Sequence, residues 1–257
     1  MEYFYLKEYA EKMQDIADDC VERILKGQCD GMYTLKISSL KRDFHLEHLD
    51  EELLADMLSE REEFSITDFY SDEISVKVEP EFLKSEEETN LKVLSPHDIQ
   101  VMLSKHYLWL YDEYGGVQAD FSNCYIENFD FSRAALCSCV MNSAKFVNCS
   151  FFKTSMCSAE CVGTKFTNCN MHDITCEECN FYGAEFRNCN MERGIYTHSN
   201  FHKALFVQSE LGQMDFRGSC VAETEWIDTN ITECRMENTS ESFDDWQDQG
   251  DVPGLEM

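Results

Sequence analysis

Fourteen cysteines give this 257-residue chain its most reactive side chains, and several of them lie close together in the sequence. One group contains four thiols and a histidine: Cys157, Cys161, His172, Cys176 and Cys179. A C-x-x-C pair with two further thiols supplies enough ligands for a tetrahedral zinc ion. Zinc binding is therefore the first chemistry that the pattern suggests.

A second candidate is the segment His45-Leu46-Glu47-His48, where two histidines flank an acid. The i, i+3 spacing beside an expected helix start is more typical of solvent-exposed residues than of a metal site. The chain contains no nucleophile motif, no phosphate-binding glycine loop and no H-E-x-x-H sequence. We therefore predict a non-enzymatic protein without a cofactor.

The arrangement of these residues follows a five-residue period over residues 119–238. An apolar side chain falls at every fifth position for 24 consecutive repeats, from Phe121 to Met236. With 43% apolar residues overall, the chance of such a run is on the order of 10⁻⁹. A second set of small residues, mainly Ala, Cys and Thr, lies two positions before each of them. This half of the chain is a repeat array.

A period of five fits one flat side of a coil in which two residues point inward and three point outward. A longer period of 20 is visible independently, because asparagines recur at Asn128, Asn148, Asn168 and Asn188. Four sides of five residues make one coil of 20. The pattern thus predicts a four-sided coil.

These residues resemble the pentapeptide-repeat family, whose motif is roughly Ala-(Asp/Asn)-Leu-x-x. Segments that show the motif are residues 119–121, 144–146, 184–186 and 190–191. The resemblance implies a right-handed quadrilateral β-helix of about six coils over residues 119–238. At about 4.8 Å per coil, six coils form a rod about 29 Å long. The expected core ladder is Phe146, Phe166, Phe186, Phe206 and Trp226.

The repeat also offers a simpler explanation of the cysteines. Cys179 occupies the small inward position, and Cys161 and Cys176 occupy the large one. Free cysteine behaves there as a small hydrophobic residue. We therefore prefer reduced, metal-free thiols and a reducing, cytoplasmic location. The sequence start predicts neither a signal peptide nor a membrane span.

Residues 1–83 are expected to form an acidic α+β domain. Apolar spacing predicts a helix from Leu6 that stops at Gly27, a strand over residues 33–37 and a helix over residues 50–58. That second helix should bury Leu53, Leu54 and Met57. A hairpin should follow, with strands at residues 64–66 and 74–78. This order of elements is that of a winged-helix domain.

Residues 84–94 are predicted to be a linker and residues 95–118 a helix that caps the solenoid. Ser95 is its expected N-cap, followed by Pro96. The predicted buried side chains of this helix are Ile99, Met102, Leu103, Tyr107 and Leu110. A cap is needed because an end coil has no neighbour.

The last segment, residues 239–257, is predicted to be an acidic cap and tail. Its large apolar residues, Phe243 and Trp246, would cover the last coil or form a small homodimer contact.

Charge gives the main functional expectation, since the chain carries a net formal charge of −29. Residues 1–118 hold 28 acidic and 12 basic residues, whereas residues 119–238 hold 16 and 9. Such a surface repels nucleic acid and acidic membranes and attracts basic proteins. The expected binding surface comprises Asp68, Asp72, Glu73, Glu86, Glu87 and Glu88.

Three functions fit these features. The favoured one is an immunity or inhibitor protein that neutralises a basic, nucleic-acid-acting partner. The family resemblance implies an alternative, in which the acidic rod mimics DNA and binds a type II topoisomerase. A third is a bacterial effector or scaffold in which the rod presents the N-terminal domain.

Overall fold

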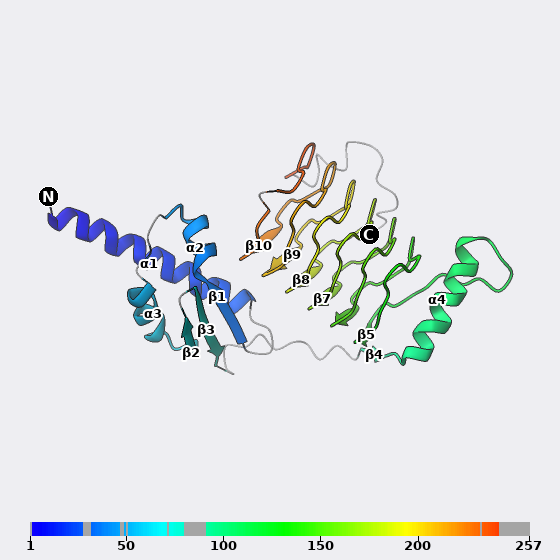
Figure 1. Cartoon of the computed structure of the whole chain (residues 1–257), viewed down its shortest axis with the longest axis horizontal. Helices are drawn as coiled ribbons and strands as arrows, with labels where there is room; N and C mark the ends of the chain where they lie inside the picture. Colours follow the sequence, from blue (N-terminus) through cyan, green and yellow to red (C-terminus); the bar gives the residue numbers. More distant parts are fainter. Residues whose placement is uncertain are drawn as a thin grey trace. The chain divides into compact units, whose positions relative to one another are not determined.

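The computed structural model describes residues 2–27, 32–46, 49, 51–70, 72–79, 91–231 and 233–241, with side chains from Lys12 onward. The chain divides into two compact units, Met1–Glu88 and Thr89–Met257. Figure 1 shows a small α+β unit and a unit of stacked coils.

In its described residues, the first unit contains three helices and a three-stranded sheet. Its elements are α1 (Glu2–Gly27), β1 (Met32–Lys36), α2 (Ile37–Asp43), α3 (Glu51–Ser59), β2 (Phe64–Tyr70) and β3 (Glu73–Val78). The antiparallel sheet has the order β1-β3-β2. The element order is therefore helix, strand, two helices and a β-hairpin.

One face of α1 forms the core of this unit. Met13, Ile16 and Ile24 are fully buried, and α1 contacts α3, β1 and β3. Leu35 and Val76 are the inward-facing partners from the sheet. Apolar residues at i, i+3 and i+4 thus pack a helix against the sheet.

Several local predictions for this unit differ from the structure. The second predicted helix, α3, buries Leu54 and Leu58, whereas Leu53 is 37% exposed. Residue 50, its expected cap, lies outside the described residues. The first strand ends at Lys36 and Ile37 already begins α2, a helix that the pattern did not predict. Residues 67–73, which lie between the two predicted hairpin strands, belong largely to the strands, because β2 extends to Tyr70 and β3 begins at Glu73.

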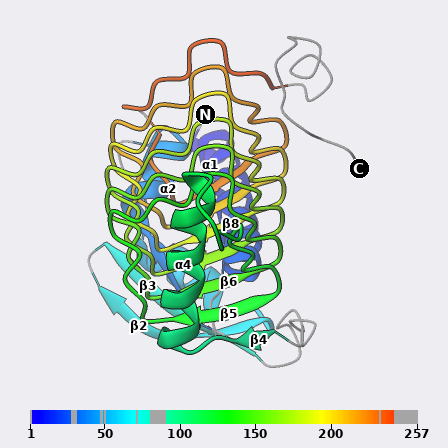
Figure 2. The same ribbon diagram turned by 90° about the vertical axis from the view of Figure 1, so that its right-hand side faces the viewer.

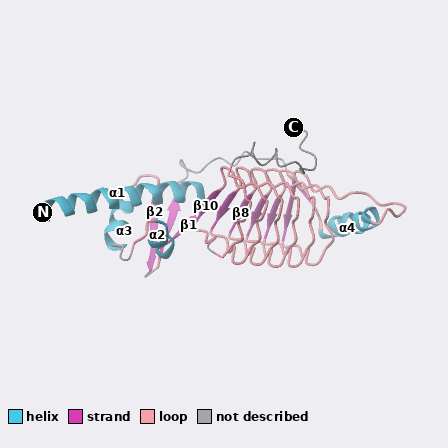
Figure 3. Ribbon diagram, turned by 90° about the horizontal axis from the view of Figure 1, so that it is seen from above, coloured by secondary structure: helices cyan, strands magenta, loops and turns pink. Residues whose placement is uncertain are grey.

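The second unit is a β-solenoid whose strands repeat every 20 residues. They are β5 (Cys124–Glu127), β6 (Lys145–Val147), β7 (Lys165–Thr167), β8 (Glu185–Arg187), β9 (Leu205–Val207) and β10 (Glu225–Ile227). These strands form a parallel ladder in sequence order, and β4 (Lys92–Val93) pairs with its first strand. Figures 1 and 3 show the ladder on one side of the coils. The predicted 20-residue coil is therefore confirmed.

Backbone hydrogen bonds join each coil to the next. The amide of Met156 donates to the carbonyl of Thr175 at 2.7 Å, and the amide of Thr175 donates back to the carbonyl of Thr154 at 3.0 Å. The same pattern recurs along the other sides of the coil through isolated parallel bridges. Each residue is thereby aligned with the one 20 positions later.

The aromatic ladder fills the interior behind the strands. Phe146 stacks on Phe166 with ring centroids 5.3 Å apart, and Phe166 stacks on Phe186 at 5.2 Å. The column continues through Phe206 to Trp226 at 4.8 and 4.5 Å. The four phenylalanines are completely buried, whereas Trp226 in the last coil is half-buried.

The corners of the coil explain the asparagine column. Nearly every residue two positions after a central apolar residue has a left-handed backbone, with φ of 49° to 61° for the non-glycine residues. This conformation disfavours most L-residues, while Asn tolerates it. Asn148, Asn168 and Asn188 occupy such corners, and Asn168 Nδ2 donates to Asn148 Oδ1 at 3.2 Å.

The small inward position supplies a second set of hydrogen bonds. Thr154 Oγ1 donates to the Phe131 carbonyl at 2.7 Å, and Ser199 Oγ donates to the Cys176 carbonyl at 2.7 Å. Cys189 Sγ makes the same contact with the Phe166 carbonyl at 3.4 Å. Cysteine therefore replaces Ser or Thr here as a weak donor that is also apolar.

Helix α4 (Pro96–Leu110) covers the first coil, as Figure 2 shows. Ser95 Oγ accepts a hydrogen bond from the Asp98 amide at 3.2 Å, which confirms the predicted N-cap. Ile99 is buried in the solenoid core. Tyr107, predicted to be buried, is 54% exposed, and His106 is buried instead. Its Nδ1 accepts a hydrogen bond from the Ala119 amide at 3.1 Å, which ties the helix to the first coil.

Two further positions in the solenoid differ from the expected pattern. Thr167, expected to face outward, is only 7% exposed, and His202 is 8% exposed. His202 Nδ1 lies 3.1 Å from the Ala222 carbonyl. Some sides of the coils therefore bury more than two of their five residues.

We predict that Phe166→Ala destabilises the solenoid by about 3 to 5 kcal/mol, because it leaves a cavity between two stacked rings. Glu177→Ala is the matched control: the side chain is exposed, so its loss should change the unfolding free energy by less than about 0.5 kcal/mol. Urea unfolding of both variants measures the difference. Equal destabilisation would show that the inward and outward positions are misassigned.

We also predict that acid loosens the α4 cap. Burial lowers the pKa of His106. Above about pH 6.5 the ring is neutral in both the folded and the unfolded chain, so its contribution to the unfolding free energy is fully present. As the pH falls below that value the unfolded chain binds more protons, and stability decreases by up to about 1.4 kcal/mol per pH unit. Unfolding free energies at pH 7.5 and 5.5 test this. His106→Gln keeps an acceptor without a titrating ring and should lose less stability; an identical loss would contradict the assignment.

Candidate functional site

The acidic candidate surface of the first unit centres on α3. Leu54 and Leu58 face the core, which turns Glu52 and Asp56, four residues apart, toward solvent. The helix carries three acidic residues and no Lys or Arg. It therefore presents only negative charge outward.

The hairpin contributes further acidic residues, but they differ in what they contact. Asp68 and Glu73 are exposed on β2 and β3. The Asp72 carboxylate instead accepts hydrogen bonds from the Ser38 amide at 3.0 Å and from Ser38 Oγ at 2.9 Å. Since these contacts lie at the start of α2, Asp72 stabilises the positive end of that helix. Residues 86–88 lie outside the described residues.

Most basic side chains described in this unit are already paired with acids. Arg23 contacts Asp19 at 2.5 Å and Asp43 at 2.8 Å, and Lys41 contacts Glu51 at 2.7 Å. Two more pairs are Lys26–Glu22 and Arg61–Asp18. These contacts neutralise several of the positive charges locally, so the exposed charge of the unit is mostly negative, although Lys12 and Lys77 are also exposed.

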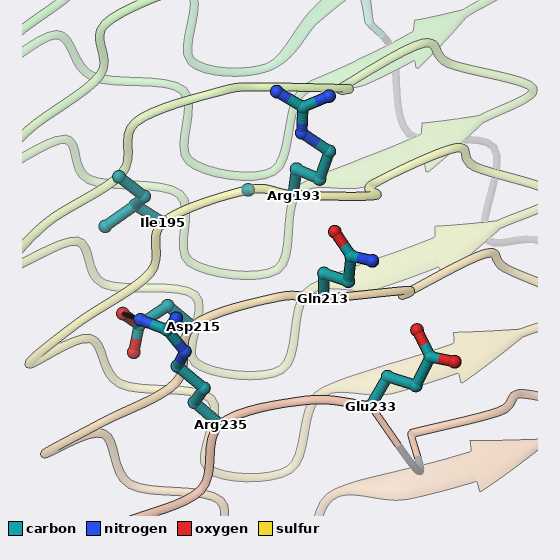
Figure 4. Close-up of a pocket in the computed structure, with 7 residues that line it drawn as sticks. Arg193, Ile195, Gln213, Asp215, Glu233 and Arg235 are labelled. Carbon is teal, nitrogen blue, oxygen red and sulfur yellow. Dashed lines mark ion pairs between the residues drawn. The ribbon is translucent and has the colours of Figure 1, made fainter.

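The solenoid has a shallow hollow of about 370 Å³ on its last coils, drawn in Figure 4. Its lining residues are Arg193, Gly194, Ile195, Gln213, Asp215, Glu233 and Arg235. Arg217 donates two hydrogen bonds to Asp215, at 2.8 and 2.7 Å, and thereby lowers the pKa of that carboxyl. Asp215 therefore stays ionised and paired, and is poorly suited to proton transfer.

A second hollow of about 310 Å³ adjoins the first and shares Arg193, Gln213 and Glu233 with it. Its other lining residues are His172, Glu192 and Gly212. A side chain at Gly212 would lie 3.2 Å from Glu192 Oε1, so the missing side chain creates part of this space. A hollow that depends on one glycine could not be predicted from the spacing of the apolar residues.

Four charged residues recur every 20 positions and form one column: Arg133, Lys153, Asp173 and Arg193. Asp173 pairs with both of its neighbours, since Arg193 Nε lies 3.1 Å and Lys153 Nζ 3.8 Å from its carboxylate. The positive charges of Lys153 and Arg193 are therefore partly neutralised within the column.

The four thiols considered for zinc do not share a site. Cys161, Cys176 and Cys179 are buried in the core, whereas Cys157 is half-buried on the outer side. Burial raises the pKa of Cys161 and Cys176 well above the usual value, which favours neutral thiols. No cluster of three or more metal-binding side chains occurs in the part of the chain that the structure describes.

Tyr196 accounts for part of this buried environment. Its hydroxyl is enclosed and has no hydrogen-bond partner among the described residues, and burial raises its pKa. Gly194 leaves the space for its ring, because a Cβ there would lie 2.5 Å from Tyr196 Cε2. Cys176 occupies the same position in the preceding coil, and the ring of Tyr196 is much larger than that side chain.

The remaining histidine motif is only partly described. His45 is exposed and has a left-handed backbone with φ of 52°. Its proposed partners, Glu47 and His48, lie outside the described residues. Among the described helices, none is long and apolar enough to cross a membrane.

Comparison with known proteins supports the repeat assignment. The sequence profile for "Pentapeptide repeats" matches residues 117–151 and 159–195, in eight copies. A search of curated proteins found no match.

Solved structures with detectable similarity include three that cover about half of this chain. A pentapeptide repeat protein (Rfr23) from the cyanobacterium Cyanothece 51142 is 13% identical, with 56% of this chain and 99% of that chain covered and a TM-score of 0.31. One from the Arabidopsis thaliana thylakoid lumen is 16% identical, with 46% and 69% covered and a TM-score of 0.27.

The third is a trypsin-treated form of QnrB1, described as a plasmid-mediated fluoroquinolone resistance protein. It is 15% identical, with 48% of this chain and 75% of that chain covered and a TM-score of 0.24. The identification itself comes from the sequence profile together with the 20-residue coils of the second unit. The second unit therefore contains pentapeptide repeats over residues 117–151 and 159–195 and folds as a β-solenoid.

Proposed function

We propose that this chain is a non-enzymatic cytoplasmic binding protein that neutralises or protects a basic, nucleic-acid-acting partner, in the manner of an immunity or inhibitor protein. The binding surface is the acidic face of the first unit, comprising Glu52 and Asp56 on α3 and Asp68 and Glu73 on the hairpin. We call this surface the α3–hairpin face.

One observation carries the proposal: a winged-helix order of elements is combined with an acidic α3. In helix-turn-helix proteins that bind DNA, the second helix of the motif enters the major groove and basic residues contact the phosphates. Here that helix carries Glu51, Glu52 and Asp56 and no basic residue. Such a face repels nucleic acid and complements a protein surface that itself binds nucleic acid.

Exposed apolar side chains near these acids supply contact area. Leu53 on α3 is 37% exposed, and Phe69 and Tyr70 on β2 are 43% and 64% exposed. Charged residues steer association, whereas aromatic anchors contribute most to the lifetime of a complex. The α3–hairpin face provides both kinds of group.

The charges of the solenoid favour the first unit over the rod as the binding surface. Several basic residues in neighbouring coils pair with acids, as in Lys165–Glu185 and Lys203–Glu223 at 3.4 and 3.8 Å. A rod that mimics DNA for a topoisomerase needs a continuous negative surface. This alternative therefore rests on the family resemblance and the rod shape.

We predict that Glu52→Gln, Asp56→Asn and Asp68→Asn, combined in the full chain, reduce capture of the partner. Affinity purification from a lysate followed by mass spectrometry should recover a basic DNA- or RNA-acting protein with the unmodified chain. The triple variant should slow its association by about 10-fold or more at low salt, because long-range steering is lost. The difference should shrink at 0.15 M salt, where the Debye length is about 8 Å.

The matched control removes three exposed acids from the solenoid: Glu177→Gln, Glu178→Gln and Glu237→Gln. This control changes the net charge by the same amount as the first triple variant. If the control associates with the partner as fast as the unmodified chain does, binding is assigned to the α3–hairpin face. Capture of a topoisomerase that is lost with this control and kept with the first variant would refute the proposal and support DNA mimicry by the rod.

A further inference from the structure

Two cysteines on the outside of the solenoid stand apart from the other thiols. Ten of the cysteines described are buried, whereas Cys137, Cys157 and Cys234 are half-buried. Cys137 and Cys157 occupy the same outward position in successive coils, one residue after a central apolar residue. They are therefore neighbours on one side of the rod.

The backbone fixes the spacing of this pair. Ala135 and Ser155 form a parallel bridge, and the Ser138 amide donates to the Cys157 carbonyl at 2.8 Å. In-register neighbours on parallel strands are about 4.8 Å apart. The Ser155 hydroxyl lies close to both sulfur atoms, 3.1 Å from Cys137 Sγ and 3.8 Å from Cys157 Sγ.

This arrangement suits a soft cation between two thiolates. A metal–thiolate bond is about 2.3 Å long, so a linear sulfur–metal–sulfur bridge spans about 4.6 Å, which side chains on backbones about 4.8 Å apart can supply. A disulfide also fits that backbone spacing but needs the sulfur atoms about 2.05 Å apart, and both thiols are free in the structure. Cu(I) is one of the soft metals that thiolate ligands select.

We propose that Cys137 and Cys157 bind one Cu(I) ion in two-coordinate geometry. The ion replaces both thiol protons: Cu⁺ and two thiols give an anionic bis-thiolate complex and two protons. The coil backbone holds the two ligands side by side before the ion arrives. Half-burial leaves the sulfur atoms accessible while limiting the approach of further ligands.

One observation favours a two-coordinate ion over zinc. The described residues contain no group of three or more metal-binding side chains, so a tetrahedral protein site is not formed around this pair. Because two protons leave, binding should weaken as the solution is made more acidic.

The experiment titrates the reduced, folded full chain with Cu(I) under anaerobic conditions against a chromogenic Cu(I) chelator. We expect one tightly held equivalent, with Cys137→Ser or Cys157→Ser weakening its binding by at least about 100-fold, since each variant leaves a single thiolate. Cys234→Ser removes a half-buried thiol from the last coil and should bind as the unmodified chain does.

Circular dichroism recorded during the titration distinguishes this site from the buried thiols. An unchanged spectrum at one equivalent supports binding at the outer pair. Full affinity in either single variant, one retained equivalent in the double variant, or loss of the β-solenoid spectrum on binding would each overturn the proposal.

Discussion

The in-register hydrogen bonds between successive coils are the constraint on which the rest of the structure depends. Each coil both donates to the next and accepts from it, as Met156 and Thr175 illustrate. Because the partner of a residue lies one coil away, any property of one position is repeated along a column. The aromatic ladder, the left-handed asparagine corners and the paired charges are all consequences of this alignment, as is the placement of two outer cysteines side by side.

Much of the solenoid could be predicted from the sequence, because the apolar residues recur with the period of the coil. The first unit was less predictable: apolar spacing alone does not distinguish the two faces of a short helix, so Leu53 was assigned to the core although Leu58 occupies it. His106 was missed because its partner, the Ala119 amide, comes from outside the helix. The site is the least predictable part, since the cap made by Asp72 and the hollow left by Gly212 depend on contacts between distant residues.

The two units differ in how they use charge. In the solenoid, acids and bases of neighbouring coils pair, as with Asp173 between Lys153 and Arg193, which lets a charged rod stack without strong self-repulsion. In the first unit the described bases are largely neutralised by nearby acids, while α3 keeps its acids exposed. The solenoid is thus acidic with part of its charge paired between coils, whereas the first unit combines exposed acids on α3 with exposed apolar side chains.

Two deletions, one of a whole coil and one that is a residue shorter, test the central claim most directly, since that claim is the 20-residue register. Removal of residues 168–187 joins Thr167 to Asn188 and preserves every column, whereas removal of residues 168–186 shifts all later coils by one position. Hydrogen exchange measured by mass spectrometry should show that the first deletion keeps slow amide exchange throughout the remaining coils and that the second loses it after the junction. Similar protection in both proteins would contradict the register on which this account depends.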